Sequence, residues 1–204
     1  MKYTGPKARR VRRHGVNLFT SDKYDRILQK KPYGPGKNPR SRRGKVSEFG
    51  TQLLEKQKVR AIFGISERQF RRYLEEALRS KQATGARILQ ILEMRLDNIL
   101  FRAGFALTRF QARQMAGHGL FRINKQRVNV ASHPVKPGDT IEAHKHTTSS
   151  PLFSPILAAT EKLVPPSWLR VNPTTLSIEI IAFPAPEHFE QGIDIQKVVE
   201  LYSR

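Results

Sequence analysis

Two arginines with helical spacing are the side chains whose chemistry is clearest. Arg109 and Arg113 stand four residues apart, with Gln114 beside them. A guanidinium is planar and donates paired hydrogen bonds, which suits it to the oxygens of a phosphate. Because side chains at i and i+4 share one face of a helix, the pair predicts a phosphate-binding face. Basic residues in the segment 122–127 would extend that face.

The overall charge points to the same kind of partner. The 204 residues include 37 Lys and Arg against 17 Asp and Glu, a net charge of +20. Residues 1–50 hold 15 basic and three acidic residues, whereas residues 151–204 hold four and six. Such an excess is compensated best by a polyanion, since each neutralised phosphate releases counterions. The sequence therefore predicts nucleic acid as the partner.

Several classes of function are excluded by what the sequence lacks. There is no Cys, so disulfides, thiol nucleophiles and Cys-ligated metals are ruled out. His144 and His146 alone are too few ligands for a metal site. No Gly-rich phosphate loop or recognisable nucleophile occurs, so we expect no enzyme activity and no cofactor. No apolar run approaches the ~20 residues that a membrane helix needs, so no membrane association is expected.

The elements that must position the basic residues follow from periodicity and end signals. Residues 1–46 are basic and rich in Pro and Gly, which predicts an extended arm that orders on its partner. Apolar residues then recur with helical spacing, and residues 84–104 predict one central core helix or two abutting helices. Short alternating runs predict strands. The expected helices cover 52–64, 66–79, 84–104, 108–116 and 195–202, with Ser66 and Thr108 as expected N-terminal caps. The expected strands cover 120–123, 128–130, 140–142 and 176–180.

These elements predict an α+β fold, mainly α, in three parts. Residues 1–46 form the basic arm. Residues 47–92 and 144–204 form a helical domain with a proline-rich C-terminal segment. Residues 93–143 form an inserted module of two helices and a small β-hairpin or sheet. Trp168 is expected to anchor the proline-rich segment.

Two further interpretations stay open on the residues alone. The segment 93–117 also fits a helix-turn-helix, with 108–116 as the recognition helix of a DNA-binding regulator. The basic arm and the lack of a dimerisation element argue against it. An RNA-modifying enzyme would need a separate catalytic domain, for which the chain has no room. In the helix 66–79, the pairs Arg71–Glu75 and Arg72–Glu76 could instead use arginine charge within the helix.

Specific motifs then identify a known family. The runs 95–105, 108–114, 122–124 and 128–130 resemble the S4 RNA-binding domain. Outside that domain, Gly5-Pro6-Lys7, the runs 55–60 and 67–71, Pro166–Leu169 and the C-terminal 199–204 resemble the bacterial-type ribosomal protein S4 family, in the right order along nearly the whole chain.

The resemblance implies a structural constituent of the small ribosomal subunit and a primary ribosomal-RNA-binding protein. It implies that the protein nucleates assembly of the 5′ domain of small-subunit ribosomal RNA at a multi-helix junction. It also implies contact with ribosomal protein S5 and other small-subunit proteins, a place where mRNA enters, and influence on translational accuracy. We expect no stable homo-oligomer. The location would be the cytoplasm, or an organelle with its own ribosomes.

Charge and resemblance together assign residues to contacts. The residues expected to bind RNA are basic or polar and lie on the arm, the helices and the hairpin: Lys7, Arg9, Arg10, Arg12, Arg13, Arg40, Arg42, Arg43, Lys45, Gln52, Lys56, Lys58, Arg60, Arg68, Arg71, Arg72, Arg95, Arg102, Thr108, Arg109, Arg113, Gln114, His118, Asn124, Lys125 and Arg127. The C-terminal residues expected to contact a neighbouring protein are Glu200, Leu201 and Tyr202. Replacing Arg109 and Arg113 together is expected to weaken RNA binding without unfolding the chain.

The sequence departs from the family pattern at two places. Some members bind zinc through a cysteine cluster in the arm, so this chain is a zinc-free form. The hairpin turn often reads Asn-Gly, whereas here it reads Asn124-Lys125. Lys is disfavoured at positive φ, so the geometry of this turn is left open by the sequence.

Overall fold

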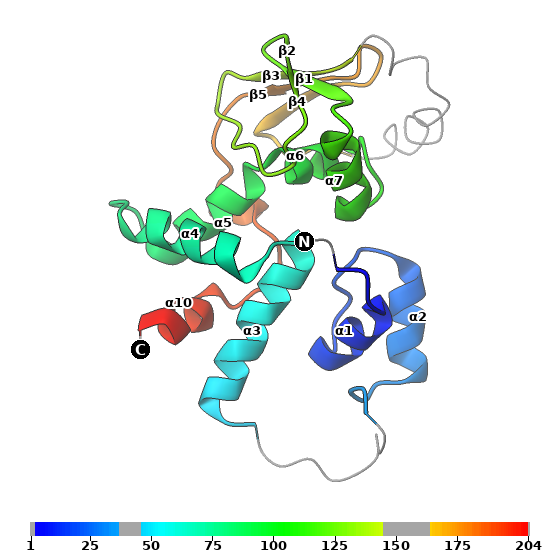
Figure 1. Cartoon of the computed structure of the whole chain (residues 1–204), viewed down its shortest axis with the longest axis vertical. Coiled ribbons are helices and arrows are strands. Elements are labelled where there is room, and N and C mark those ends of the chain that lie inside the picture. Colours follow the sequence, from blue (N-terminus) through cyan, green and yellow to red (C-terminus); the bar gives the residue numbers. More distant parts are fainter. Residues whose placement is uncertain (1–2, 37–45, 145–163, 204) are drawn as a thin grey trace. The chain divides into compact units, whose positions relative to one another are not determined.

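The computed structural model describes residues 3–36, 46–144 and 164–203, and they fall into two compact units (Figure 1). The first unit comprises Met1–Ala86 and Gln191–Arg204, and the second comprises Arg87–Glu190. Helix α5 (Thr84–Glu93) spans the boundary between them. No helix among the described residues is long and apolar enough to cross a bilayer.

The first unit is helical. The longest described helix, α3 (Glu48–Phe63), is preceded by Ser47, whose hydroxyl accepts a hydrogen bond from the Gly50 amide, and is followed by Gly64 with φ 61°. Helix α4 (Glu67–Leu78) is preceded by Ser66, whose hydroxyl accepts from the Gln69 amide as the sequence predicts. The C-terminal helix packs against α3. The helices are α1 (Lys7–His14), α2 (Asp22–Lys30), α3 (Glu48–Phe63), α4 (Glu67–Leu78) and α10 (Ile195–Ser203).

The N-terminal arm differs from the extended chain that its composition predicts, because it contains α1 and α2. Val11 is fully buried, and Leu18 and Phe19 are nearly so. Phe19 also meets the ring of Tyr24 edge to face. These few apolar side chains form a small core that the high polarity of the segment hides from a compositional argument.

The second unit is built on a five-stranded antiparallel sheet with the order β2-β1-β3-β5-β4. One face of the sheet packs on two helices, and both sides of this contact contribute fully buried residues, among them Phe121 and Ile141 from the sheet and Ile99 and Leu100 from α6 (Figure 1). The elements are α6 (Leu96–Arg102), α7 (Arg109–Gly117), β1 (Phe121–Ile123), β2 (Gln126–Val128), β3 (Thr140–Ala143), β4 (Leu169–Asn172), β5 (Ser177–Ile180) and the short 3₁₀ helix η1 (Pro186–His188).

The hairpin between β1 and β2 turns at two residues with positive φ, Asn124 at 49° and Lys125 at 71°. The Asn124 side chain holds this turn. Its Nδ2 donates to Asp139 Oδ1 at 2.8 Å, and its Oδ1 accepts from the Thr140 amide at 3.0 Å. A Lys in place of the usual Gly is therefore accommodated, since side-chain hydrogen bonds compensate for the unfavourable backbone conformation.

The predicted class, mainly α with a small sheet, is confirmed. The expected strands near β1, β3 and β5 and the closing helix α10 are confirmed as well. Of the two alternatives for residues 84–104, two abutting helices are confirmed, α5 and α6, which are separated by Met94 and Arg95. Strand β4 has no counterpart in the prediction. With β5 it places 169–180 in the sheet of the second unit, whereas the sequence assigns these residues to the helical domain.

Candidate RNA-binding surfaces

Arg95, a predicted RNA contact, is a buried structural residue. It is 1% exposed and forms a two-pronged ion pair with Asp97. Its Nε lies 3.0 Å from Asp97 Oδ1, and its Nη2 lies 2.6 Å from Oδ2. Arg113 approaches the same carboxylate, with Nη1 3.6 Å from Oδ2. Arg95 has no surface from which to reach a phosphate, so its assignment to RNA contact is corrected.

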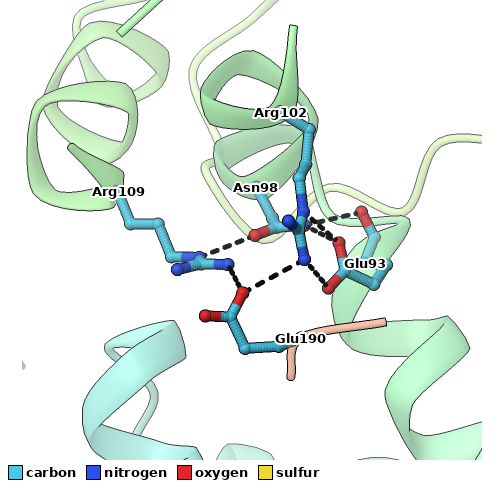
Figure 2. A network of polar contacts seen from close by, with 5 residues as sticks. All are labelled: Glu93, Asn98, Arg102, Arg109 and Glu190. Carbon is cyan, nitrogen blue, oxygen red and sulfur yellow. Dashed lines mark hydrogen bonds and ion pairs between the residues drawn. The ribbon is translucent and has the colours of Figure 1, made fainter. Parts of the chain in front are cut away.

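Figure 2 shows a second buried network in the same unit, centred on Glu93. Glu93 is fully buried, and its carboxylate accepts from Asn98 Nδ2 at 2.6 Å. It also accepts from Nε and Nη2 of Arg102, at 2.9 and 2.7 Å. Burial alone would lower the pKa of Arg102, but the hydrogen bonds and charge of Glu93 outweigh it and the pKa is raised. The guanidinium is held permanently charged by an internal partner.

Glu190, near the end of the unit, joins this network (Figure 2). Its Oε2 accepts from Arg102 Nη2 at 3.1 Å and forms a close ion pair with Arg109. Arg109 Nε also donates to Asn98 Oδ1 at 2.8 Å, and its side chain is 10% exposed. Hydrogen bonds and ion pairs of these charged side chains thus link the three helices α5, α6 and α7.

The predicted phosphate face of α7 stays a prediction, but both of its arginines have acidic neighbours within the chain. Arg109 pairs with Glu190, and Arg113 lies near Asp97. Removing both arginines would leave two carboxylates short of partners, at a cost in stability. We therefore expect this double replacement to destabilise the second unit, and the expectation that it does not unfold the chain stays a prediction. A lower RNA affinity of that variant could therefore result from lost stability as well as from lost RNA contacts.

A different basic surface is exposed where α7 ends and the hairpin begins. Arg127 donates from Nε to the Gly119 carbonyl at 3.0 Å and from Nη2 to the His118 carbonyl at 3.1 Å. A Cβ at Gly119 would lie 2.7 Å from Arg127 Nε, so only glycine admits this contact. The structure thereby brings together predicted contacts that are exposed: Gln114, His118, Asn124, Lys125 and Arg127.

Thr108 serves α7 directly. Its Oγ1 accepts from the Gln111 amide at 3.2 Å, so it caps the helix as predicted.

Arg122, on the neighbouring strand, has Nη2 3.0 Å from His144 Nε2. The metal alternative for His144 involved His146, which lies outside the described residues. Among the residues that the structure describes, no group of three or more His, Cys, Asp or Glu could hold a metal ion.

In the first unit, the cations of α3 are partly used within the chain. Lys56 Nζ lies 3.0 Å from Glu67 Oε1, and Arg60 also pairs with Glu67. Lys58 lies 3.2 Å from Glu55. Gln52 is 2% exposed and donates to Glu48 and to Glu200, so its assignment to RNA contact is corrected.

The cations of α4 and of the arm are more accessible. Arg68, Arg71 and Arg72 are all exposed. Arg71 Nε lies 3.8 Å from Glu67, one turn earlier, in place of the Glu75 pairing considered from the sequence. Arg9 and Arg13 are exposed on α1, whereas Lys7, Arg10 and Arg12 are partly covered. The predicted contacts Arg40, Arg42, Arg43 and Lys45 lie outside the described residues.

Two arm arginines are held by aromatic rings. The Arg10 guanidinium lies 3.4 Å from the centre of the Tyr3 ring, and that of Arg12 lies 4.9 Å from the Tyr33 ring. Arg12 also donates to the carbonyls of Tyr33 and Gly34, at 3.1 and 3.3 Å. These contacts fold the chain after α2 back onto α1.

The C-terminal residues make contacts inside the chain. Tyr202 Oη donates to Glu67 Oε1 at 2.6 Å. Burial, and then this hydrogen bond, raise the pKa of Tyr202, so the phenol stays protonated. Glu200 accepts from Gln52 Nε2 at 3.2 Å. The assignment of Glu200, Leu201 and Tyr202 to a neighbouring protein stays a prediction.

Several residues that matter to these surfaces were not found from the sequence. Glu93 and Glu190 belong to no quoted motif and are marked only by their charge, whereas Asn98 lies in the run 95–105 and one helical turn before Arg102. His14 and Gln57, which line a cavity between α1 and α3, are also absent from the predicted set, although each belongs to a basic segment. The arrangement as a whole places guanidinium and ammonium groups where they can bind phosphates.

Comparisons with known proteins agree in both halves of the chain. A family model described as the ribosomal protein S4/S9 N-terminal domain matches residues 2–93, and one described as the S4 domain matches 94–141. The chain is 44% identical over 206 residues to the small ribosomal subunit protein uS4 of Roseiflexus sp. (strain RS-1), covering 100% of this chain and 99% of that protein. It is 41% identical over 209 residues to the uS4 protein of Natranaerobius thermophilus, with coverages of 100% and 99%. It is 41% identical over 199 residues to that of Borrelia duttonii, with coverages of 97% and 96%.

Proposed function

The chain belongs to the family of the small ribosomal subunit protein uS4, and from that premise we propose that it binds the 5′ domain of small-subunit ribosomal RNA directly and nucleates assembly of that domain. The family consists of structural RNA-binding constituents of the small subunit rather than enzymes. The prediction of the family, of a non-enzymatic function and of a place in the small subunit is thereby confirmed.

The observation that carries the proposal is where exposed basic side chains gather. In the first unit they lie on α1 and α4, where Arg9, Arg13 and Arg72 are exposed. In the second unit they lie at the end of α7 and on the hairpin, where Lys125 and Arg127 are exposed. Each unit thus offers a cationic surface of its own, which supports binding to more than one RNA helix.

The mechanism follows from the chemistry of a helix junction. Where several RNA helices meet, phosphates are concentrated and repel one another. Arg and Lys side chains that neutralise them lower this repulsion and release counterions. Recognition relies on shape and backbone, because side chains read A-form RNA poorly through its deep major groove. Two cationic surfaces on one chain would fix the mutual angles of the helices that they contact.

The finer partners are also part of the proposal. We infer that the chain contacts ribosomal protein S5, lies where mRNA enters the small subunit and influences translational accuracy. We also infer that it forms no stable homo-oligomer. These rest on the family resemblance of the chain from Gly5 to the C-terminal 199–204. Incorporation of the labelled chain into small subunits with and without S5 would test the first of them.

A binding titration across a salt series tests the central proposal. The competitors are the 5′ domain of small-subunit ribosomal RNA, an unrelated RNA of equal length and duplex DNA. We expect a preference for the ribosomal RNA that survives raised salt, because shape-specific contacts persist after counterion release is weakened. Equal binding to all three that collapses with salt would contradict the proposal, and a preference for duplex DNA would favour the helix-turn-helix alternative.

A further inference from the structure

A cavity in the first unit is lined by five side chains that can donate hydrogen bonds and by the apolar Ala61 and Ile65. It has a volume of about 250 Å³ and lies against α1 and α3, with Arg10, Arg13, His14, Gln57 and Arg60 as its polar lining. Among these lining residues of the described chain, none is acidic. The volume corresponds to roughly eight water molecules at about 30 Å³ each, so it admits a phosphodiester group.

One of these donors is buried without an acceptor. Arg60 pairs with Glu67 through Nη1, and its Nε takes no part in that ion pair. This Nε is buried and has no hydrogen-bond partner among the described residues. Leaving a buried charged donor unsatisfied is costly, so the site favours an acceptor that arrives from outside the chain.

A second arginine at the cavity is held in place before any ligand binds. The Arg10 guanidinium stacks on Tyr3 at 3.4 Å from the ring centre. Stacking on a ring leaves the edge of the guanidinium available for hydrogen bonds in its own plane. Less conformational entropy is lost when such a group binds an anion.

His14 adds a titratable group to the same lining. The pKa of His14 is lowered to about 4, first by burial and then by the positive charges of Lys58, Arg13 and Arg10, against the opposing charge of Glu55. These are the charged groups that face it from α1 and α3. The imidazole is therefore neutral at pH 7 in the absence of an anion.

We propose that this cavity receives one phosphate group of the RNA backbone, and that His14 takes up a proton as the phosphate enters. The inference rests on the proposed RNA-binding function and adds the site and a protonation step to it. An anion beside the imidazole replaces the repulsion of the arginines by attraction, so the charged form becomes favourable. The proton comes from solvent, and no bond other than N–H forms. RNA affinity must then rise as pH falls.

The first experiment compares the full chain with His14→Gln for binding to the 5′-domain RNA at pH 7.5 and pH 5.5. If the bound imidazole returns to its ordinary pKa of 6.5, linkage favours the natural chain by about 10-fold at pH 5.5 and by less than about 1.5-fold at pH 7.5. His14→Gln lacks the imidazole, so any pH dependence that remains in this variant comes from other titrating groups of the protein or the RNA. An equal pH dependence of the two chains would overturn the protonation of His14.

The second experiment places a carboxylate in the cavity. Gln57→Glu should weaken RNA binding by at least about 10-fold, because a negative charge would face the phosphate. Gln196→Glu makes the same change of charge at an exposed position of α10 in the same unit, and should change affinity less than about 2-fold. Circular dichroism checks that both variants keep their helices. Equal effects of the two substitutions would overturn the cavity as the site.

A third measurement separates failure of this inference from failure of the proposed function. The probe is inorganic phosphate, and the readout is the NMR titration of the His14 imidazole at constant ionic strength. Phosphate in place of chloride should raise the titration midpoint of His14, and Gln57→Glu should abolish the rise. No rise would overturn the cavity even where the RNA is bound specifically. A rise in a chain that shows no preference for ribosomal RNA would support the cavity and refute the proposed function.

Discussion

Arginine has opposite uses in the two units. In the second unit, Arg95, Arg102 and Arg109 are largely buried and paired with carboxylates of the same unit. In the first unit, Arg13 and Arg72 are exposed, and the Nε of Arg60 is a buried donor without a partner among the described residues. The net charge of +20 therefore overstates what the second unit offers to RNA.

The difference has a physical cause in the acidic partners. Glu93, Asp97 and Glu190 are placed beside the arginines of the second unit, where little water screens them. A buried ion pair contributes little net stability when intact, but removing one partner leaves an uncompensated charge. The buried arginines of the second unit should therefore be judged by folding, and the exposed arginines of either unit by binding.

Arg95→Ala is the change expected to have the largest effect. It leaves the buried carboxylate of Asp97 without its main partner, so the free energy of unfolding should fall by about 3–5 kcal/mol. Trp168 is the sole tryptophan and is buried in the second unit, so its fluorescence during urea unfolding reports on that unit. Arg72→Ala, at an exposed site, is the control and should cost less than about 0.5 kcal/mol. A loss below about 1 kcal/mol for Arg95→Ala would break the contrast between the units.

Replacing Arg68 and Arg72 on α4 should have an intermediate effect, on binding alone. Both lie outside the ion pairs described for Glu67, so the double alanine variant should keep its unfolding free energy. If each contacts a phosphate, the slope of log affinity against log salt should become shallower by about two. Filter binding over a salt series measures that slope, with the exposed Lys23→Ala and Lys81→Ala together as a charge-matched control. An unchanged slope would remove α4 from the RNA surface.

Tyr202→Phe should have the smallest effect and tests the acidic network of the first unit. It deletes the hydrogen bond to Glu67, which should cost about 1 kcal/mol at pH 7. Burial alone would raise the pKa of Glu67, but the hydrogen bonds from Tyr202 and Lys56 and the charge of Arg60 lower it. Because the pKa of Glu67 is lower in the folded than in the unfolded state, its carboxylate stabilises the fold at pH values above the unfolded pKa near 4.5. That stabilisation is lost as the pH falls below this value.

The pH dependence supplies the check on this last variant. Urea unfolding followed by helical circular dichroism should show a smaller difference between the natural chain and Tyr202→Phe at pH 3.5 than at pH 7. Tyr24→Phe is the control, since its ring contact with Phe19 does not need the hydroxyl. A difference that grows toward low pH would contradict the role assigned to Glu67.

Much of the secondary structure follows from local signals. Ser47, Ser66 and Thr108 cap their helices through side-chain oxygens, and the sequence alone already points to the last two as caps. The helices of the arm escaped prediction because their core is only a few residues, Val11 among them, within a strongly basic segment. Strand β4 escaped because Leu169–Asn172 is short and follows prolines, and its pairing with β5 is what identifies it.

The sequence by itself determined the family, the cationic character and most helix ends, because motifs, charge and caps are local properties of the chain. Only the tertiary structure decided which cations remain available. Glu190 lies 81 residues from Arg109 and 88 from Arg102, and no local pattern connects them. Folding brings that carboxylate to both guanidiniums, while around Arg10, Arg13 and Arg60 it forms a cavity whose lining has no acid. Whether an arginine stabilises the fold or binds phosphate thus depends on the charges that the fold places beside it and on how far they are removed from water.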